Sequence, residues 1–347
     1  NQNVDGDVIH DVFTRLLYAQ YPLIILGGGV ANGECEGVAK AMRTIGAASM
    51  VSTAGRGLVD PVDPFTFGAC LARPSSAEVA AKADLVVAVG CELAEVDLWR
   101  SELGHAAPLI RVDLDASVGT ADPKTSMFVQ SDGASFILAL ADQFDEPLNT
   151  EWKADNVMMW RARWRSEVIS ERPNIAPVIE VLKAAVPDDT MIYSDMTQLA
   201  YAAVELWDMA LPKHWHHPSG FGTLGYATPA AIGGAIARPS KPTMAIIGDY
   251  GFHYTMAELG VAVELGLSIP IVLWDNAKLG EIEDSMTAAQ IAPNAVIAHN
   301  PDFCKLAEAF GANTSAPENL IELDKAVQSA FNADGPTLIY VTPKILA

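Results

Sequence analysis

Short apolar runs alternate with amphipathic segments along the chain. Apolar runs that end at glycine or polar residues predict buried parallel strands, and apolar residues at three- and four-residue spacing predict helices. The predicted strands span 22–26, 48–51, 85–90, 109–113, 190–194, 243–248, 269–274 and 336–341. The predicted helices span 7–18, 34–45, 77–83, 178–185, 256–265, 302–310 and 320–331. This alternation predicts an α/β protein made of two doubly wound domains, with parallel sheets covered by helices on both faces.

One segment, 144–177, interrupts this alternation. It contains Pro147, tryptophans at 152, 160 and 164, and charges of alternating sign. These features predict a crossing linker with one amphipathic helix whose indoles pack between the domains. We therefore predict a nucleotide-fold domain at 1–147, a linker at 148–177 and a second domain at 178–347.

The glycine-rich turn after the first predicted strand has the layout of a dinucleotide-binding unit. Gly27, Gly29 and Gly33 match only a loose form of the glycine fingerprint. The next predicted strand runs into Ser52, where a ribose-binding acid is expected. NAD is therefore disfavoured, and a tight turn is the preferred interpretation. Arg56 lies in a glycine-flanked loop and could bind a phosphate, but the preferred interpretation is a surface arginine near a turn.

Composition excludes several classes of protein. The 347 residues carry a formal net charge of −21, which argues against nucleic acid and anionic membranes as partners. No apolar run approaches the length of a membrane span, and the four cysteines form no CxxC pair. We expect a protein of the reducing cytoplasm. The chain opens on Asn1, without an initiator Met or a signal peptide, so we expect this start to lie in the middle of something longer.

The strongest candidate site lies at the ends of two predicted strands in the second domain. Asp249 follows the strand at 243–248, and Asp275 and Asn276 follow the strand at 269–274. A crossover of 276 − 249 = 27 residues can set parallel strand tips side by side. A carboxylate and an amide there suit Mg²⁺, and backbone N–H groups near Gly251 suit phosphates. For either half alone, helix capping or a turn is the preferred explanation, whereas the pair together points to the metal.

Residues 248–252 (GDYGF) and 275–282 (DNAKLGEI) together resemble the cofactor motif of thiamin diphosphate (ThDP) enzymes. The resemblance implies that Asp249, the Asn276 side chain and the Lys278 backbone carbonyl bind Mg²⁺. It also implies cofactor contacts from Thr197, Gln198, Gly222, Thr223, Leu224, Gly248, Asp249, Tyr250, Gly251, Asn276, Lys278, Leu279 and Gly280. The chain departs from the motif at Tyr250, where glycine is usual, and at Asp275, where asparagine is usual.

Two further segments extend this resemblance. In the glycine-rich stretch 217–233, the Gly222 carbonyl would accept a hydrogen bond from the cofactor's 4′-amino group, and Leu224 would be the wedge that bends the cofactor. Thr197 and Gln198 align with a phosphate-contacting segment, although helix capping by Asp195 or Thr197 explains that stretch equally well.

Substrate-facing residues are less clearly indicated. Three nearby histidines, His214, His216 and His217, make a poor zinc pattern and are interpreted as solvated loop residues, with substrate contact by His217 as the alternative. The acids that follow Gly280 are expected either to hold a cationic substrate tail or to favour the helix dipole. These acids are Glu281, Glu283 and Asp284.

Residues 53–57 and 83–90 resemble the central domain of acetolactate synthase-like ThDP enzymes, which in some members holds FAD or another nucleotide. The sequence leaves that ligand undecided. In that family the activating glutamate belongs to a pyrimidine-binding domain that the resemblance does not cover, so no catalytic residue is certain here. We expect a separate domain or subunit to complete the site, an oligomeric assembly, and no activity from this chain alone.

The resemblance implies decarboxylation of a 2-oxo acid first and acetolactate-type carboligation second. A non-catalytic or nucleotide-binding subunit that kept the fold is the alternative from another functional class.

Overall fold

The computed structural model describes residues 4–346 and divides into two compact units. Unit 1 comprises the residues up to Glu167 together with Asp208–Lys213, and unit 2 comprises Val168–Trp207 and the residues from His214 onward. The division falls inside the stretch 148–177 that we assigned to a linker. The first three residues of the predicted domain at 1–147 lie outside the described part of the chain.

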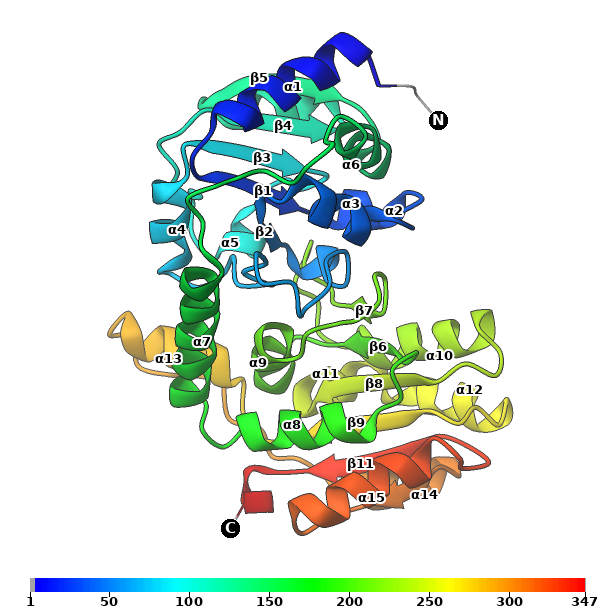
Figure 1. The fold of residues 1–347 in the computed structure, drawn as a ribbon. Helices are drawn as coiled ribbons and strands as arrows, with labels where there is room; N and C mark the ends of the chain where they lie inside the picture. The colour runs from blue at the N-terminus through cyan, green and yellow to red at the C-terminus, as the bar shows by residue number, and fades with distance from the viewer. Residues whose placement is uncertain (1–3, 347) are drawn as a thin grey trace. The chain divides into compact units, whose positions relative to one another are not determined.

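Unit 1 is built on a five-stranded parallel sheet of order β2-β1-β3-β4-β5 (Figure 1). Its strands are β1 (Pro22–Leu26), β2 (Ala48–Val51), β3 (Leu85–Val89), β4 (Leu109–Asp113) and β5 (Thr125–Gln130). The sequence pattern did not predict β5. Only Val129 of this edge strand is buried, so the strand lacks the apolar run that marks the others.

Helices cover both faces of this sheet. They are α1 (Gly6–Tyr18), α2 (Gly28–Asn32), α3 (Val38–Ile45), α4 (Ser76–Lys82), α5 (Glu95–Leu98), α6 (Gly133–Ala141) and the first part of α7 (Ala154–Glu171). Along β1, Ile24 and Leu26 face the core under α1, α3 and α6, whereas Leu23 and Ile25 face the core under α4 and α7. This alternation within a fully buried strand confirms the doubly wound arrangement.

The helix predicted at 34–45 is shorter than expected. Helix α2 begins directly after Gly27, and α3 begins only at Val38. Gly37 precedes α3 with a φ of +88°, a left-handed conformation that a continuous helix does not accommodate. The prediction was wrong between Glu34 and Gly37 because it followed the apolar spacing through this glycine.

The glycines after β1 allow the chain to pack against itself. A Cβ at Gly27 would lie 2.0 Å from the Gly90 carbonyl oxygen, and one at Gly29 would lie 2.8 Å from the Gly90 Cα. A Cβ at Gly28 would lie 2.8 Å from the Ala54 side chain. The turns after β1 and β3 therefore interlock, which favours the tight-turn interpretation.

The tryptophans at 152 and 164 belong to the core of unit 1. The indole N–H of Trp152 donates to the Pro22 carbonyl (2.9 Å), and that of Trp164 donates to the Ser75 hydroxyl (2.9 Å). A buried indole needs an acceptor for its N–H, and both acceptors lie in unit 1. The expectation that these rings pack between domains was therefore wrong.

Unit 2 contains a six-stranded parallel sheet of order β10-β11-β9-β8-β6-β7 (Figure 1). Its strands are β6 (Met191–Ser194), β7 (Trp215–His216), β8 (Thr243–Gly248), β9 (Pro270–Trp274), β10 (Asn313–Ser315) and β11 (Thr337–Val341). The four longer strands match predicted ones, whereas the short edge strand β7 was expected to be loop and the short edge strand β10 was not predicted.

One face of this sheet packs on α10 (Ala227–Ala237), α11 (Asp249–Thr255), α12 (Leu259–Glu264) and α14 (Phe303–Phe310). Helices α8 (Ala176–Ala185), α9 (Gln198–Leu206) and α15 (Leu320–Ala330) lie on the other face, and α13 (Gly280–Ala288) follows β9. The helix predicted at 256–265 begins earlier, because α11 starts directly after β8 and a 3₁₀ turn joins it to α12. Within residues 4–346, no helix is both long and apolar enough to cross a membrane.

Candidate cofactor and metal site

The predicted site lies at the carboxyl ends of β6, β8 and β9. In the β8–β9 ladder Gly248 pairs with Trp274, so Asp249 and Asp275 leave neighbouring strands at the same level. Asn276 follows one residue later. The structure thus brings together the strand tips that the spacing predicted, at the edge of a parallel sheet where ligands commonly bind.

A residue that the sequence analysis missed joins the two acids. The Asn300 amide nitrogen donates to Asp249 Oδ2 (2.7 Å) and to Asp275 Oδ1 (2.8 Å). Asn300 lies in the loop before α14, and nothing in its local pattern places it at the strand tips. The only signal would have been the need to compensate a second carboxylate at position 275.

Burial and charge set the electrostatics of the two acids. Burial raises the pKa of Asp249, and the nearby Asp275 carboxylate adds to this, while the hydrogen bond from Asn300 opposes it. Asp275 also accepts hydrogen bonds from the Ala277 backbone (2.9 Å) and the Tyr340 hydroxyl (2.8 Å). Burial and this contact raise the pKa of Tyr340 above its usual range. Asp275 is thus committed to donors from the protein.

Gln198 links the tip of β9 to the start of α9. The Asn276 amide donates to Gln198 Oε1 (3.0 Å), and Asn276 Oδ1 accepts from the Lys278 backbone (3.2 Å). A Cβ at Gly280 would lie 2.7 Å from the Gln198 carboxamide, so this glycine leaves room for the glutamine. The side chains of Gln198 and Asn276 thus hold the turn that carries the predicted Lys278 carbonyl ligand.

Asp195 anchors the glycine-rich loop and does not cap α9. Its buried carboxylate accepts from the Gly225 backbone (2.7 Å) and the Met196 backbone (2.9 Å). Burial raises its pKa, against the effect of these hydrogen bonds. Thr197 occupies the N-cap position of α9 without a capping bond from its side chain. The capping alternative for this stretch is therefore wrong.

Replacing Gly251 by alanine should destabilise unit 2. A Cβ there would lie 2.2 Å from Asp195 Oδ2, inside van der Waals contact with a buried carboxylate. Gly233→Ala is the matched control, because its Cβ would have no neighbour within 4 Å and alanine favours a helix over glycine by about 1 kcal/mol. Thermal unfolding should show a lower midpoint for Gly251→Ala only. Equal midpoints would contradict this packing.

The glycine-rich loop presents its predicted contacts near the surface. Gly222 (φ +69°) and Gly225 (φ +89°) are left-handed, a conformation that glycine adopts without strain. Gly222 and Thr223 are exposed, Leu224 is half-buried and Phe221 is 90% exposed. Helix α10 starts at Ala227, and Pro229 lies in its first turn.

The predicted substrate-side residues lie around Tyr201. His217 Nδ1 contacts the Ser194 hydroxyl (2.9 Å), and its ring meets the Tyr201 ring edge-on. Burial, with Glu281 next, raises the pKa of Tyr201 to about 12. Arg172 donates to Glu281 (2.7 Å), so this acid is already paired with a guanidinium of its own unit.

The remaining predicted residues are also paired. Lys278 binds Glu283 (2.5 Å), and Gln198 Nε2 donates to Asp284 (3.4 Å). His214 contacts Asp189 (3.1 Å), and His216 stacks on Tyr193. The expectation of solvated loop histidines was therefore wrong.

Arg56 in unit 1 also departs from expectation, because it is buried. Burial lowers its pKa to about 9, partly offset by the Asp208 carboxylate. This arginine is therefore part of the interior of unit 1 and does not lie on the surface.

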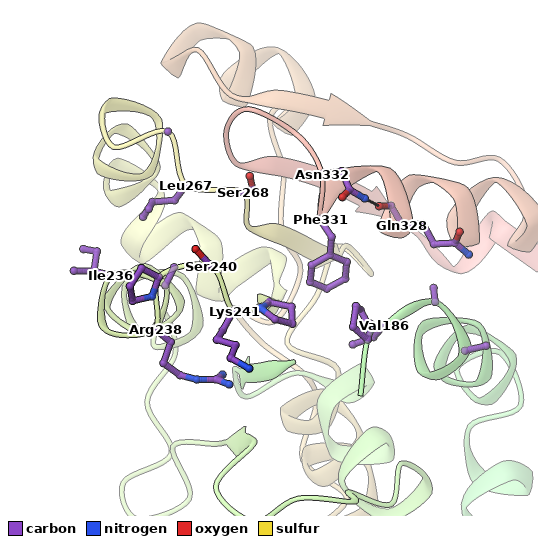
Figure 2. A pocket seen from close by; sticks show the side chains of 17 residues that line it. Val186, Ile236, Arg238, Ser240, Lys241, Leu267, Ser268, Gln328, Phe331 and Asn332 are labelled. Carbon is purple, nitrogen blue, oxygen red and sulfur yellow. Dashed lines mark hydrogen bonds between the residues drawn. The ribbon is translucent and has the colours of Figure 1, made fainter. Parts of the chain in front are cut away.

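A cavity of about 980 Å³ opens near the amino ends of the unit 2 strands, away from their carboxyl ends (Figure 2). Its lining includes Pro187, Pro242 and Ser268, which precede β6, β8 and β9. Its cations Arg238 and Lys241 both bind Asp189, at 3.0 and 2.6 Å. Among the described residues that line it, none belongs to the predicted cofactor site.

The donors at the β8 and β9 tips are of the kind that Mg²⁺ takes. A carboxylate, an amide oxygen and a backbone carbonyl are hard oxygen ligands, and Mg²⁺ usually adds water and phosphate oxygens to a few such groups. The residues present therefore fit the ion.

Comparisons with known proteins agree with this arrangement. Residues 195–341 match the C-terminal TPP binding domain of thiamine pyrophosphate enzymes, and residues 9–140 match their central domain. The chain is 36% identical to a probable 2-ketoarginine decarboxylase of Pseudomonas aeruginosa, over 94% of its own length and 58% of that protein. It is 27% identical to the large subunit of acetolactate synthase isozyme 2 of Escherichia coli, over 94% of its own length and 60% of that protein.

The fold is also that of solved structures. A benzoylformate decarboxylase from Polynucleobacter necessarius superposes with a TM-score of 0.78 at 20% identity, over 98% of this chain and 65% of the other. The chain thus spans less than two thirds of the length of the relatives compared here. The two family models cover both halves of the chain, and the 36% identical relative covers nearly all of it. The chain therefore belongs to the thiamine pyrophosphate enzyme family and carries its central and C-terminal domains.

Proposed function

We propose that this chain is part of a ThDP- and Mg²⁺-dependent enzyme that breaks or forms a C–C bond next to a carbonyl. The observation that carries the proposal is the pairing of β8 with β9, which puts Asp249 beside the Asp275–Asn276 turn in a chain of this family. When bound, ThDP supplies a carbanion centre and an electron sink.

The chain's own residues would bind and orient the cofactor. Asp249, the Asn276 amide oxygen and the Lys278 carbonyl would hold Mg²⁺, with the diphosphate beside Gly248, Tyr250 and Gly251. The other proposed cofactor contacts are Thr197, Gln198, Gly222, Thr223, Leu224, Leu279 and Gly280. A pyrimidine-binding domain or subunit would supply the activating glutamate and complete the site in an oligomer.

Decarboxylation of a 2-oxo acid is the reaction we favour. The 36% identical relative is named a probable 2-ketoarginine decarboxylase, and its match extends over 94% of this chain. His217 and Glu281 would face the substrate, since both lie beside Tyr201, and Glu281 would do so while paired with Arg172. Acetolactate-type carboligation is the second candidate, from the likeness to the acetolactate synthase large subunit. Whether the central domain binds FAD or another nucleotide is left undecided.

A CO₂-release assay tests this proposal. The chain, ThDP and Mg²⁺ would be incubated with a panel of cationic, aromatic and aliphatic 2-oxo acids, with and without a pyrimidine-binding partner from a family member. We expect CO₂ release only when the partner is present. Acetolactate formation from pyruvate would favour the carboligase, whereas cofactor binding with no turnover of any 2-oxo acid would favour a non-catalytic subunit.

A further inference from the structure

The turn that carries Lys278 is paired with a second stretch of chain, residues 296–300. Lys278 and Ile297 form an antiparallel bridge. The Leu279 N–H donates to the Val296 carbonyl (2.8 Å), and the Ala298 N–H donates to the Ala277 carbonyl (2.8 Å). In this type of pair the two facing residues do not bond to each other, so the Lys278 carbonyl is not used by the pairing. The 296–300 segment therefore shapes the turn and leaves the expected metal ligand available.

Asn300 stands at the end of this segment with its amide between the two acids. Its nitrogen donates to Asp249 Oδ2 and Asp275 Oδ1, and its oxygen lies 3.1 Å from His253 Nε2. An amide oxygen can only accept, so the histidine N–H faces it and fixes which end of the amide meets the carboxylates. Both protons of one NH₂ group are thus directed at two different carboxylates.

Asp275 and Asp249 differ in their hydrogen-bond donors, and this difference decides which of them can bind a cation. Asp275 is held by three donors, namely the Ala277 N–H, the Tyr340 hydroxyl and Asn300. Asp249 also accepts a hydrogen bond from the Asn300 side chain, so the two acids share this donor. Two buried like charges at neighbouring strand tips repel each other, and a donor between them offsets that repulsion. Asp275 is thereby satisfied by the protein, and Asp249 is left to face a cation.

We propose that Asn300 is a positioning residue of the metal site, whose neutral NH₂ group makes an aspartate at position 275 compatible with Asp249 as the metal ligand. The proposal rests on the proposed ThDP and Mg²⁺ function. Asn300 touches no cofactor in this scheme and acts through Asp249 and through the paired 277–279 turn.

A double-mutant cycle tests this role in the 347-residue chain. Asn300→Ala should weaken ThDP binding in excess Mg²⁺, measured by calorimetry, by about 10–100-fold, as is typical when a group that orients a metal ligand is lost. Asp275→Asn in the Asn300→Ala background should recover most of that loss, because it removes one charge and provides an amide that can donate to Asp249. Asn313→Ala, at an exposed position of β10, is the matched control and should bind ThDP as the wild type does.

Thermal unfolding without metal or cofactor gives an independent readout. Asn300→Ala should lower the midpoint through repulsion between the acids, and Asp275→Asn should restore it. A purely structural role for Asn300 would give losses that Asp275→Asn does not reverse, which overturns the proposal, as does unchanged affinity in Asn300→Ala. If the wild type binds no ThDP even with the pyrimidine-binding partner present, the proposed function fails, and the unfolding series alone decides whether Asn300 relieves the acid pair.

Discussion

Asp249→Ala should abolish ThDP binding that depends on Mg²⁺. We expect a loss of affinity well above 100-fold, since removal of groups that only orient a metal ligand already costs about 10–100-fold. The substituted chain should stay folded, because the change also removes a buried carboxylate that faces Asp275. Calorimetric titration of ThDP at a series of Mg²⁺ concentrations measures the effect.

The control for this experiment is Asp334→Ala, which removes an exposed acid of the same unit far from β8 in sequence. Its ThDP affinity should equal that of the wild type. If Asp249→Ala bound ThDP with the same dependence on Mg²⁺ as the wild type, the assignment of the strand tips as the metal site would be wrong.

Trp164→Ala should cause the largest loss of stability in unit 1. The side chain is fully buried against Phe67 and donates to Ser75, so truncation leaves a cavity and an unpaired hydroxyl. Large-to-small changes of this kind cost about 3–5 kcal/mol. Urea unfolding followed by circular dichroism would measure the shift of the transition.

Two variants separate packing from hydrogen bonding at this position. Trp164→Phe keeps a six-membered aromatic ring and should lose about 1 kcal/mol for the missing hydrogen bond plus a cavity cost smaller than that of Trp164→Ala. Met159→Ala removes an exposed side chain from the same helix and should stay within about 0.5 kcal/mol. If Trp164→Ala were no more costly than Met159→Ala, the indole would not be part of the unit 1 core.

The strands that the sequence predicted are those whose residues are buried on both faces. Apolar runs such as 22–26 and 243–248 can only be satisfied inside a parallel sheet, and the structure places β1 and β8 there. The edge strands β5, β7 and β10 escaped prediction because solvent on one side removes that constraint. Helix ends were less predictable, since the break before α3 depends on the left-handed Gly37.

The candidate site also contains residues that the sequence predicted and residues that it did not. Asp249 and Asn276 were predictable because the ends of neighbouring parallel strands share one edge of the sheet, whatever the tertiary detail. Asn300 and Asp195 were not, because each acts through a contact with a distant backbone or carboxylate that only the folded chain brings near. Such partners leave no periodicity in their own segment.

The interlocked turns after β1 and β3 explain the glycines of unit 1 without a ligand. Gly27 lacks room even for one methyl group, because the Gly90 carbonyl oxygen fills the space. Gly27 and Gly29 are thus needed for backbone packing, so a side chain introduced at either position would push the two turns apart whether or not a nucleotide binds elsewhere in the unit.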